Sequence, residues 1–131
     1  MRPKPARIPV MTFQSKALGQ TGETLATKFL ETKKLQILHR NLRTNYGEID
    51  ILARDGRALV IVEVKAKTDA HRGAAIEMIT PAKQAKLVLL AHELQAKYQT
   101  PNVRIDVVTV DEAENQPRLR HYKAVIEASN G

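Results

Sequence analysis

The sequence of 131 residues contains no cysteine and no tryptophan, and its aromatic residues are three tyrosines and two phenylalanines. Without cysteine, a disulfide-stabilised fold, thiol catalysis and a zinc site with cysteine ligands are excluded. Consecutive histidines are 21 to 32 residues apart, which excludes a local two-histidine metal motif. A metal site must therefore use carboxylates. The aromatic residues are too few for a surface that stacks nucleic-acid bases, so we expect any bound nucleic acid to be contacted through its backbone.

Long apolar segments are also missing. The longest uninterrupted apolar runs, 58–62 and 87–91, have five residues each, against the roughly 20 that cross a membrane. The N-terminus is basic, but its apolar part is short and interrupted by Pro9, which is not typical of a secretory signal. We therefore expect a soluble, cytoplasmic protein without a membrane partner. An organelle transit peptide is the alternative, although the prolines oppose the amphipathic helix that such peptides form.

Positive charge exceeds negative charge by seven, and the whole excess lies in the first third of the chain. Residues 1–46 contain nine Lys or Arg against two Glu, whereas residues 47–131 contain twelve of each sign. A one-sided basic region is typical of proteins that bind the phosphates of a nucleic acid; a solvated basic tail is the alternative. The Pro-rich residues 1–17 predict a flexible basic arm, and residues 18–131 predict one domain.

The hydrophobic pattern predicts an α/β domain with a mixed β-sheet flanked by helices, in the order α-β-β-β-α-β plus a short closing strand. The first helix is expected to begin between Gly19 and Thr21 and to end at Lys33 and Lys34. Thr80 and Pro81 are a typical helix start. The remaining expected elements are strands at 36–43, 48–53, 58–65, 103–110 and 119–126, a loop at 66–75 and a second helix at 80–98. A crossover through the second helix predicts that strands 58–65 and 103–110 are parallel.

The most informative residues for function are Asp50, Glu63 and Lys65, which lie on the two strands of a predicted hairpin. A turn centred on Asp55-Gly56 places Asp50 opposite Ile61. Asp50 and Glu63 are then diagonal neighbours on one sheet face, which Lys65 shares. Their backbones would be roughly 7–8 Å apart, close enough for both carboxylates to bind one cation.

Glu63 interrupts an otherwise apolar run from Ala58 to Val64, and such strands are usually buried on both faces. The burial of two adjacent carboxylates without a positively charged partner lowers the stability of the fold. A Mg²⁺ or Mn²⁺ ion would remove this cost, because hard divalent cations prefer oxygen ligands. The alternative is an ion pair of Lys65 with either carboxylate at a solvated strand end.

These residues also carry a resemblance to a known family. The stretch GEIDILARDG at 47–56, followed by LVIVEVK at 59–65, resembles the signature of the YraN-like family of uncharacterised bacterial proteins. Gly22-Glu23, Arg40-Asn41 and residues 105–108 resemble its other landmarks, so the likeness covers roughly residues 19–126. The family is similar in its core to the restriction-endonuclease-like, or PD-(D/E)xK, superfamily, and most closely to archaeal Holliday-junction resolvases.

The resemblance implies that Asp50 and Glu63 are metal ligands, with the Val64 carbonyl as a third, and that the cofactor is Mg²⁺ or Mn²⁺. Lys65 would orient the attacking water and stabilise charge on the phosphate. Glu23 would be the additional acidic residue of resolvase-like members; its alternative role is to complement the helix dipole in the first turn. The implied activity is metal-dependent endonuclease cleavage of DNA, more than RNA, with branched or structured DNA as substrate and a homodimer as the assembly.

Two positions depart from the family pattern. Ile49 stands where the motif has proline, and Ala66-Lys67 stands where the family has Thr-Arg, which keeps a cation but loses a bidentate phosphate contact. Further candidate nucleic-acid contacts are Arg43, Lys67, Lys83, Gln84 and Lys86. For Lys83, Gln84 and Lys86, near the start of the second helix, the alternative is a solvated helix face. Asp106 is expected either to support the site or to lie at a solvated strand end.

Two other functions remain open from the sequence. The first is a catalytically inactive nucleic-acid-binding module that keeps the nuclease fold. The second is an interaction protein whose basic arm binds an acidic partner. Retention of Glu23, Asp50, Glu63 and Lys65 together favours the enzyme.

Overall fold

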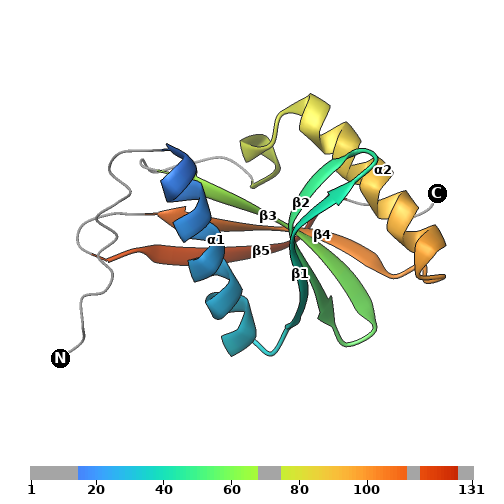
Figure 1. Cartoon of the computed structure of the whole chain (residues 1–131), viewed down its shortest axis with the longest axis horizontal. Helices are drawn as coiled ribbons and strands as arrows, with labels where there is room; N and C mark the ends of the chain where they lie inside the picture. The colour runs from blue at the N-terminus through green and yellow to red at the C-terminus, as the bar shows by residue number, and fades with distance from the viewer. Residues whose placement is uncertain (1–14, 68–74, 112–115, 127–131) are drawn as a thin grey trace.

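The chain, described here by a computed structural model, has two α-helices and a short 3₁₀ helix around five β-strands in residues 15–67, 75–111 and 116–126 (Figure 1). The elements are α1 (Ser15–Thr32), β1 (Gln36–Thr44), β2 (Gly47–Asp55), β3 (Ala58–Lys67), η2 (Ala75–Met78), α2 (Pro81–Lys97), β4 (Val103–Asp111) and β5 (Arg118–Ile126). Their order confirms the predicted α/β organisation. Neither described α-helix has the length and apolar character needed to cross a membrane.

The predicted start of the first helix was wrong. Helix α1 begins at Ser15 and not at Gly19 to Thr21, so residues 15–17 of the predicted arm are helical. The closing strand β5 confirms the predicted strand at 119–126 to within one residue, but with nine residues it is as long as β1 and is not short. The rest of the predicted arm, residues 1–14, and most of the predicted loop, residues 68–74, lie outside the described residues.

The five strands form one sheet in the order β1-β2-β3-β4-β5. β3 pairs with β4 in parallel, as the crossover predicted, and the other neighbours are antiparallel. Helix α2 begins as predicted, because Thr80 accepts a hydrogen bond from the Lys83 N–H at 3.2 Å and Pro81 takes the first helical position. β3 is therefore the central strand, with a partner on each edge.

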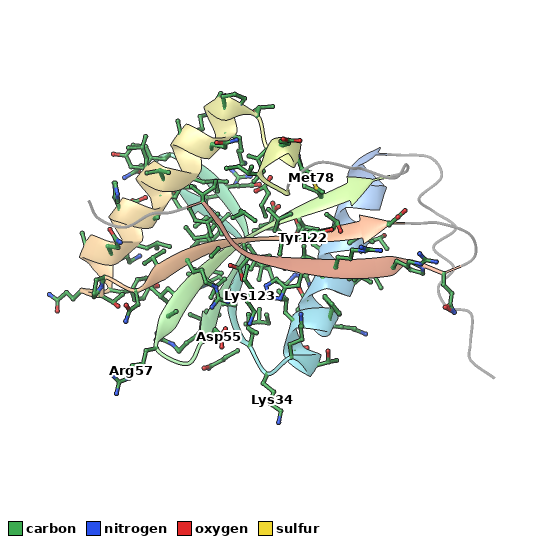
Figure 2. All side chains as sticks on the ribbon, turned by 180° about the vertical axis from the view of Figure 1, so that it is seen from behind. Lys34, Asp55, Arg57, Met78, Tyr122 and Lys123 are labelled. Carbon is green, nitrogen blue, oxygen red and sulfur yellow. The ribbon has the colours of Figure 1, made fainter. Side chains whose placement is uncertain are left out.

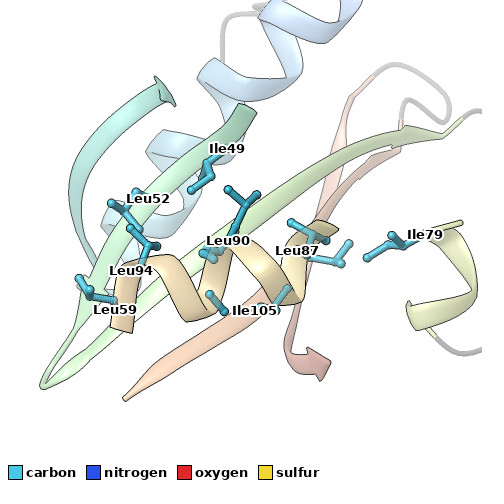
Figure 3. Close-up of a cluster of buried hydrophobic side chains, with 11 residues drawn as sticks. Ile49, Leu52, Leu59, Ile79, Leu87, Leu90, Leu94 and Ile105 are labelled. Atoms are coloured by element: carbon cyan, nitrogen blue, oxygen red, sulfur yellow. The ribbon is translucent and has the colours of Figure 1, made fainter. Parts of the chain in front are cut away.

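Both faces of the sheet are covered by a helix. In Figure 3, α2 lies in front of the strands and α1 behind them. The cluster under α2 contains Ile49, Leu52, Leu59, Ile61, Ile79, Leu87, Leu90, Ala91, Leu94, Ile105 and Val107. The cluster under α1 contains Ala26, Leu30, Leu35, Ile51, Ala53, Val60, Val62 and Val108. β3 supplies alternate residues to the two clusters, so it is buried on both faces, as its apolar run predicted.

The β2–β3 turn is centred one position later than we predicted. Asp55 pairs with Ala58, so Gly56 and Arg57 are the two loop residues. Gly56 has a φ of 63°. The first loop position of a two-residue hairpin turn requires such a positive φ, which glycine adopts without strain.

The later turn shifts the register by two residues, which leaves the paired side chains of the ladder on the predicted faces. The last pair of the β2–β3 ladder is Ile51 with Val62, so the predicted pairing of Asp50 with Ile61 is wrong. Asp50 and Glu63 are the next residues of the two strands. They lie together where the ladder ends and are not diagonal neighbours within it.

Asp106 on β4 is fully buried, which rules out the solvated strand end. Arg104 donates to both of its carboxylate oxygens at 2.9 and 3.0 Å, and the Ala124 N–H donates at 2.9 Å. His121 Nε2 lies 2.7 Å from Asp106 Oδ2, and its Nδ1 lies 3.2 Å from Lys33 Nζ. Because an ionised carboxylate only accepts hydrogen bonds, His121 carries its proton on Nε2 and accepts from Lys33.

This network connects distant segments. Arg104 also pairs with Asp55 at 3.0 Å beside the β2–β3 turn, while Lys33 follows α1. Ala124 has a φ of 53° within an irregularity of β5 opposite Asp106. Figure 2 shows Asp55, Arg57 and Lys34 on one edge of the molecule and Met78 of η2 on the opposite edge. The Asp106 network therefore connects β4 and β5 with the β2–β3 turn and with the segment that follows α1.

Burial alone would raise the pKa of Asp106, but hydrogen bonds from His121, Arg104 and Ala124 outweigh burial and lower it. A carboxyl whose folded pKa is below its unfolded value stabilises the protein above the unfolded pKa, and this stabilisation is lost as pH falls through the folded pKa. We predict that Asp106→Asn lowers the free energy of unfolding at pH 7 by about 3 kcal/mol, because it removes an ionised partner from Arg104.

Urea unfolding at pH 7 and at about pH 3 measures this effect, and the difference between wild type and variant should narrow at the lower pH. Glu31→Gln, at an exposed position of α1, is the control and should leave stability nearly unchanged. Equal stability of the Asp106 variant and wild type at pH 7 would contradict the assignment.

Candidate active site

Asp50 and Glu63 form the centre of the candidate site, at the point where β2 and β3 separate. Beyond the last ladder pair, Asp50 Oδ2 accepts a hydrogen bond from the Val64 N–H at 2.9 Å. The carboxylate thus provides an acceptor to β3 where the ladder with β2 has ended. This bond holds the Asp50 side chain against β3, next to the residue that follows Glu63.

Glu63 is buried and Asp50 is half-buried. Burial is the main cause that raises the pKa of Asp50, and the hydrogen bond from Val64 opposes it. Burial also raises the pKa of Glu63, and repulsion by the Asp50 charge raises it further. A pair of desolvated carboxylates that repel each other is an arrangement that a bound cation stabilises.

Glu23 joins this centre from α1. A Cβ built on the adjacent Gly22 would lie 3.9 Å from Val64 Cγ1 and 3.8 Å from Val110 Cγ2, so the helix backbone passes close to the ends of β3 and β4. Partial burial raises the pKa of Glu23, and the charge of Asp50 raises it further. Because α1 begins at Ser15, Glu23 is not in its first turn, and the helix-dipole explanation of this residue is wrong.

Sequence reasoning missed Asn41, which supports Glu23 from β1. The positive charge of Arg40 lowers the pKa of Glu23, and the polar side chain of Asn41 lowers it further. Asn41 has a φ of 52°, a left-handed conformation that asparagine adopts more readily than most residues. The sequence carried one usable signal, since Arg40-Asn41 was among the stretches that resembled the family, but nothing local connected it to Glu23.

Two lysines lie at the site. Lys65 is half-buried on β3 and lowers the pKa of both Asp50 and Glu63. Lys83 on α2 has its Nζ 3.8 Å from Glu63 Oε1. The sequence grouped Lys83 with possible phosphate contacts and did not predict that it pairs with a carboxylate of the centre.

The other predicted nucleic-acid contacts are more peripheral. Arg43 pairs with Glu48 at 3.5 Å near the β1–β2 turn, and its side chain is 84% exposed. Lys86 is exposed on α2, and Lys67 is the last residue of β3. Gln84 has a structural role, because its Nε2 donates to the Ile79 carbonyl at 2.9 Å and so connects α2 to the residue after η2.

The residues present fit a cation such as Mg²⁺, which takes some of its ligands from water and substrate, better than a metal whose ligands all come from the protein. Among residues 15–67, 75–111 and 116–126, no three acidic or histidine side chains are gathered into a ready-made metal cage. Mg²⁺ in phosphate-processing sites is usually held by one or two carboxylates, with the remaining ligands from water and substrate phosphates. Asp50 and Glu63 match that donor set, and Val64, whose carbonyl was the third predicted ligand, follows Glu63 in the chain.

Comparison with known proteins gives a consistent family match. The model of the uncharacterised protein family UPF0102 matches residues 22–110. A UPF0102 protein of Geobacter metallireducens is 37% identical over 119 residues, covering 89% of this chain and 98% of its own. A UPF0102 protein of Kineococcus radiotolerans is 42% identical over 111 residues, covering 82% and 91%. One of an Arthrobacter species is 43% identical over 115 residues, covering 82% and 94%.

A search of solved structures found a likeness to SfsA of Pyrococcus furiosus in complex with Ca²⁺. The TM-score is 0.38 and the sequence identity 12%, over 86% of this chain and 63% of the SfsA chain. A likeness this low gives no information about the site.

We predict that the Asp50→Asn, Glu63→Gln double variant is more stable than wild type at pH 7 without divalent cations. A carboxyl whose folded pKa is raised favours the folded state below that pKa, so wild-type stability falls as pH rises through the window above the unfolded values. The variant has no such charges to bury. Ordinary substitutions at buried positions instead cost about 1 kcal/mol or more.

Thermal unfolding from pH 4 to 8 in EDTA measures this, and the advantage of the variant should grow with pH. Glu31→Gln is the control, because Glu31 is exposed on α1 and is not among the charges that shift the pKa of Asp50 or of Glu63. A double variant that unfolds at a lower temperature than wild type at pH 7 would show that the two carboxylates are structural.

Proposed function

This chain belongs to the uncharacterised protein family UPF0102, and we propose that it is a magnesium-dependent nuclease that hydrolyses phosphodiester bonds in DNA. One observation carries the proposal. The half-buried Asp50 and the buried Glu63 lie together at the end of the β2–β3 ladder, with raised pKa values and with Lys65 two residues further along β3. Groups with perturbed pKa values that are gathered at one point of a fold are typical of functional sites.

The proposed mechanism assigns a role to each residue. Asp50 and Glu63, with the Val64 carbonyl, would hold Mg²⁺ or Mn²⁺, which acts as a Lewis acid and lowers the pKa of a bound water. Lys65 would orient the attacking water and donate a hydrogen bond to the phosphate oxygens as negative charge develops on them. Glu23 would add an acceptor from the α1 side of the centre.

The character of the surroundings supports a nucleic acid as substrate. Lys65 and Lys83 lie at the carboxylate centre, while Lys86 and Arg43 are exposed on α2 and near the β1–β2 turn. Positive side chains around a phosphate-processing centre bind the nucleic-acid backbone and not the bases. A protein of this kind would select DNA by its shape, which favours branched or otherwise structured DNA.

We predict that Asp50→Ala and Glu63→Ala each abolish Mg²⁺-dependent cleavage, whereas DNA binding in EDTA is unchanged or stronger, because each variant removes a negative charge. The assay uses duplex, single-stranded, flapped and four-way branched DNA with Mg²⁺ or Mn²⁺. Lys65→Met should reduce cleavage by at least about 100-fold, the range for loss of a group that stabilises transition-state charge.

Glu31→Gln is again the control and should cleave like wild type, since Glu31 is exposed on α1 and its charge does not shift the pKa of Asp50 or of Glu63. Cleavage by either alanine variant at the wild-type rate would refute the proposal. DNA binding by all proteins without cleavage by wild type would instead indicate a catalytically inactive binding module.

A further inference from the structure

Lys83 has an unusual position among the cations of the site, because it comes from a different layer than the carboxylates. It lies in the first turn of α2, beside the Thr80 cap. From there its Nζ reaches to 3.8 Å from Glu63 Oε1 on the central strand. The Glu63 side chain is only 10% exposed, while that of Lys83 is 35% exposed. The pair therefore joins a buried acid to a cation that retains access to water.

Lys83 also acts on both carboxylates. It lowers the pKa of Asp50 and that of Glu63, and in each case by more than Lys65 does, although Lys65 is on β3 itself. One ammonium group thus neutralises part of the charge of two carboxylates. A divalent cation shared by Asp50 and Glu63 would have the same electrostatic effect, with twice the charge.

The geometry of the pair makes it weak enough to exchange. A charge-assisted hydrogen bond between nitrogen and oxygen is about 2.7–2.9 Å long, so a separation of 3.8 Å is an ion pair without a strong hydrogen bond. Lysine carries a compact charge on a flexible stem of four methylene groups, and it adapts its position without movement of the backbone. Lys83 can leave Glu63 by rotation of its own side chain.

We propose that Lys83 is an exchangeable counter-ion: it stabilises Asp50 and Glu63 in the metal-free protein, leaves Glu63 when a divalent cation binds, and then contacts a substrate phosphate. This inference rests on the proposed metal site and adds an order of events to it. The protein would hold its ammonium group away from phosphate until the metal is present. Metal binding and DNA binding would then be coupled through one side chain.

The coupling is tested by the affinity for a short DNA duplex, measured by fluorescence anisotropy in EDTA and in Ca²⁺. Lys83→Met keeps the apolar stem and removes the charge. Exchange predicts that Lys83→Met weakens DNA binding about fivefold in Ca²⁺ and leaves it nearly unchanged in EDTA, where Lys83 of the wild type is held by Glu63. Lys86→Met, an exposed lysine three residues along the same helix, is the matched control and should weaken binding equally under both conditions.

Calorimetric titration with Mn²⁺, with and without the duplex, separates this inference from the proposed function. Exchange predicts that Lys83→Met binds Mn²⁺ about fivefold more tightly than wild type in the absence of DNA, because the competing cation is gone. The exchange would be overturned, and the metal site left intact, if wild type binds the metal but Lys83→Met loses DNA affinity equally in EDTA and in Ca²⁺. The same conclusion follows if Lys83→Met loses no DNA affinity under either condition. No metal binding by wild type, with or without DNA, would overturn both.

Discussion

The burial of the middle of β3, residues 59–63, is the constraint on which the rest of the site depends. This part of the strand lies in the middle of the sheet, with a helix over each face, so a polar side chain on it loses most of its contact with water. Glu63 is nevertheless part of it and is buried. The electrostatic cost of that glutamate cannot be relieved by solvent and must be met by neighbouring charges. The proposed binding of a cation therefore has its physical reason in the architecture of the sheet.

The same sheet contains a second buried carboxylate, Asp106, and its contacts differ from those of Asp50 and Glu63. Asp106 has hydrogen bonds from Arg104, His121 and Ala124, which together lower its pKa despite burial. Asp50 and Glu63 have one backbone hydrogen bond and one loose ion pair among the contacts of the described residues, and their pKa values are raised. Asp106 is satisfied by the protein alone. The Asp50 and Glu63 pair is not, which is expected of a site completed by a ligand.

Much of this could be read from the sequence because it depends on local patterns. The apolar run of β3, the Thr80-Pro81 helix start and the glycine of the β2–β3 turn each predicted an element that the structure confirms. The error in the turn centre was harmless, because a register shift of two residues preserves the faces. The Asp106 network could not be predicted, since it connects β4 with residues of β5 and with Lys33, which is 88 residues from His121. The pairing of Lys83 with Glu63 depended in the same way on how α2 packs on the sheet.

The candidate site also has a thermodynamic consequence. Its groups come from α1, β1, β2, β3 and α2, so they are assembled only in the folded chain. A cation bound there would bind the folded state and not the unfolded one, and would therefore stabilise the protein in proportion to the logarithm of its concentration. The charges that make the metal-free fold less stable are the ones that would bind the metal. If the proposed metal site is correct, the protein would have lower stability without metal in exchange for a site that is already assembled before the metal binds.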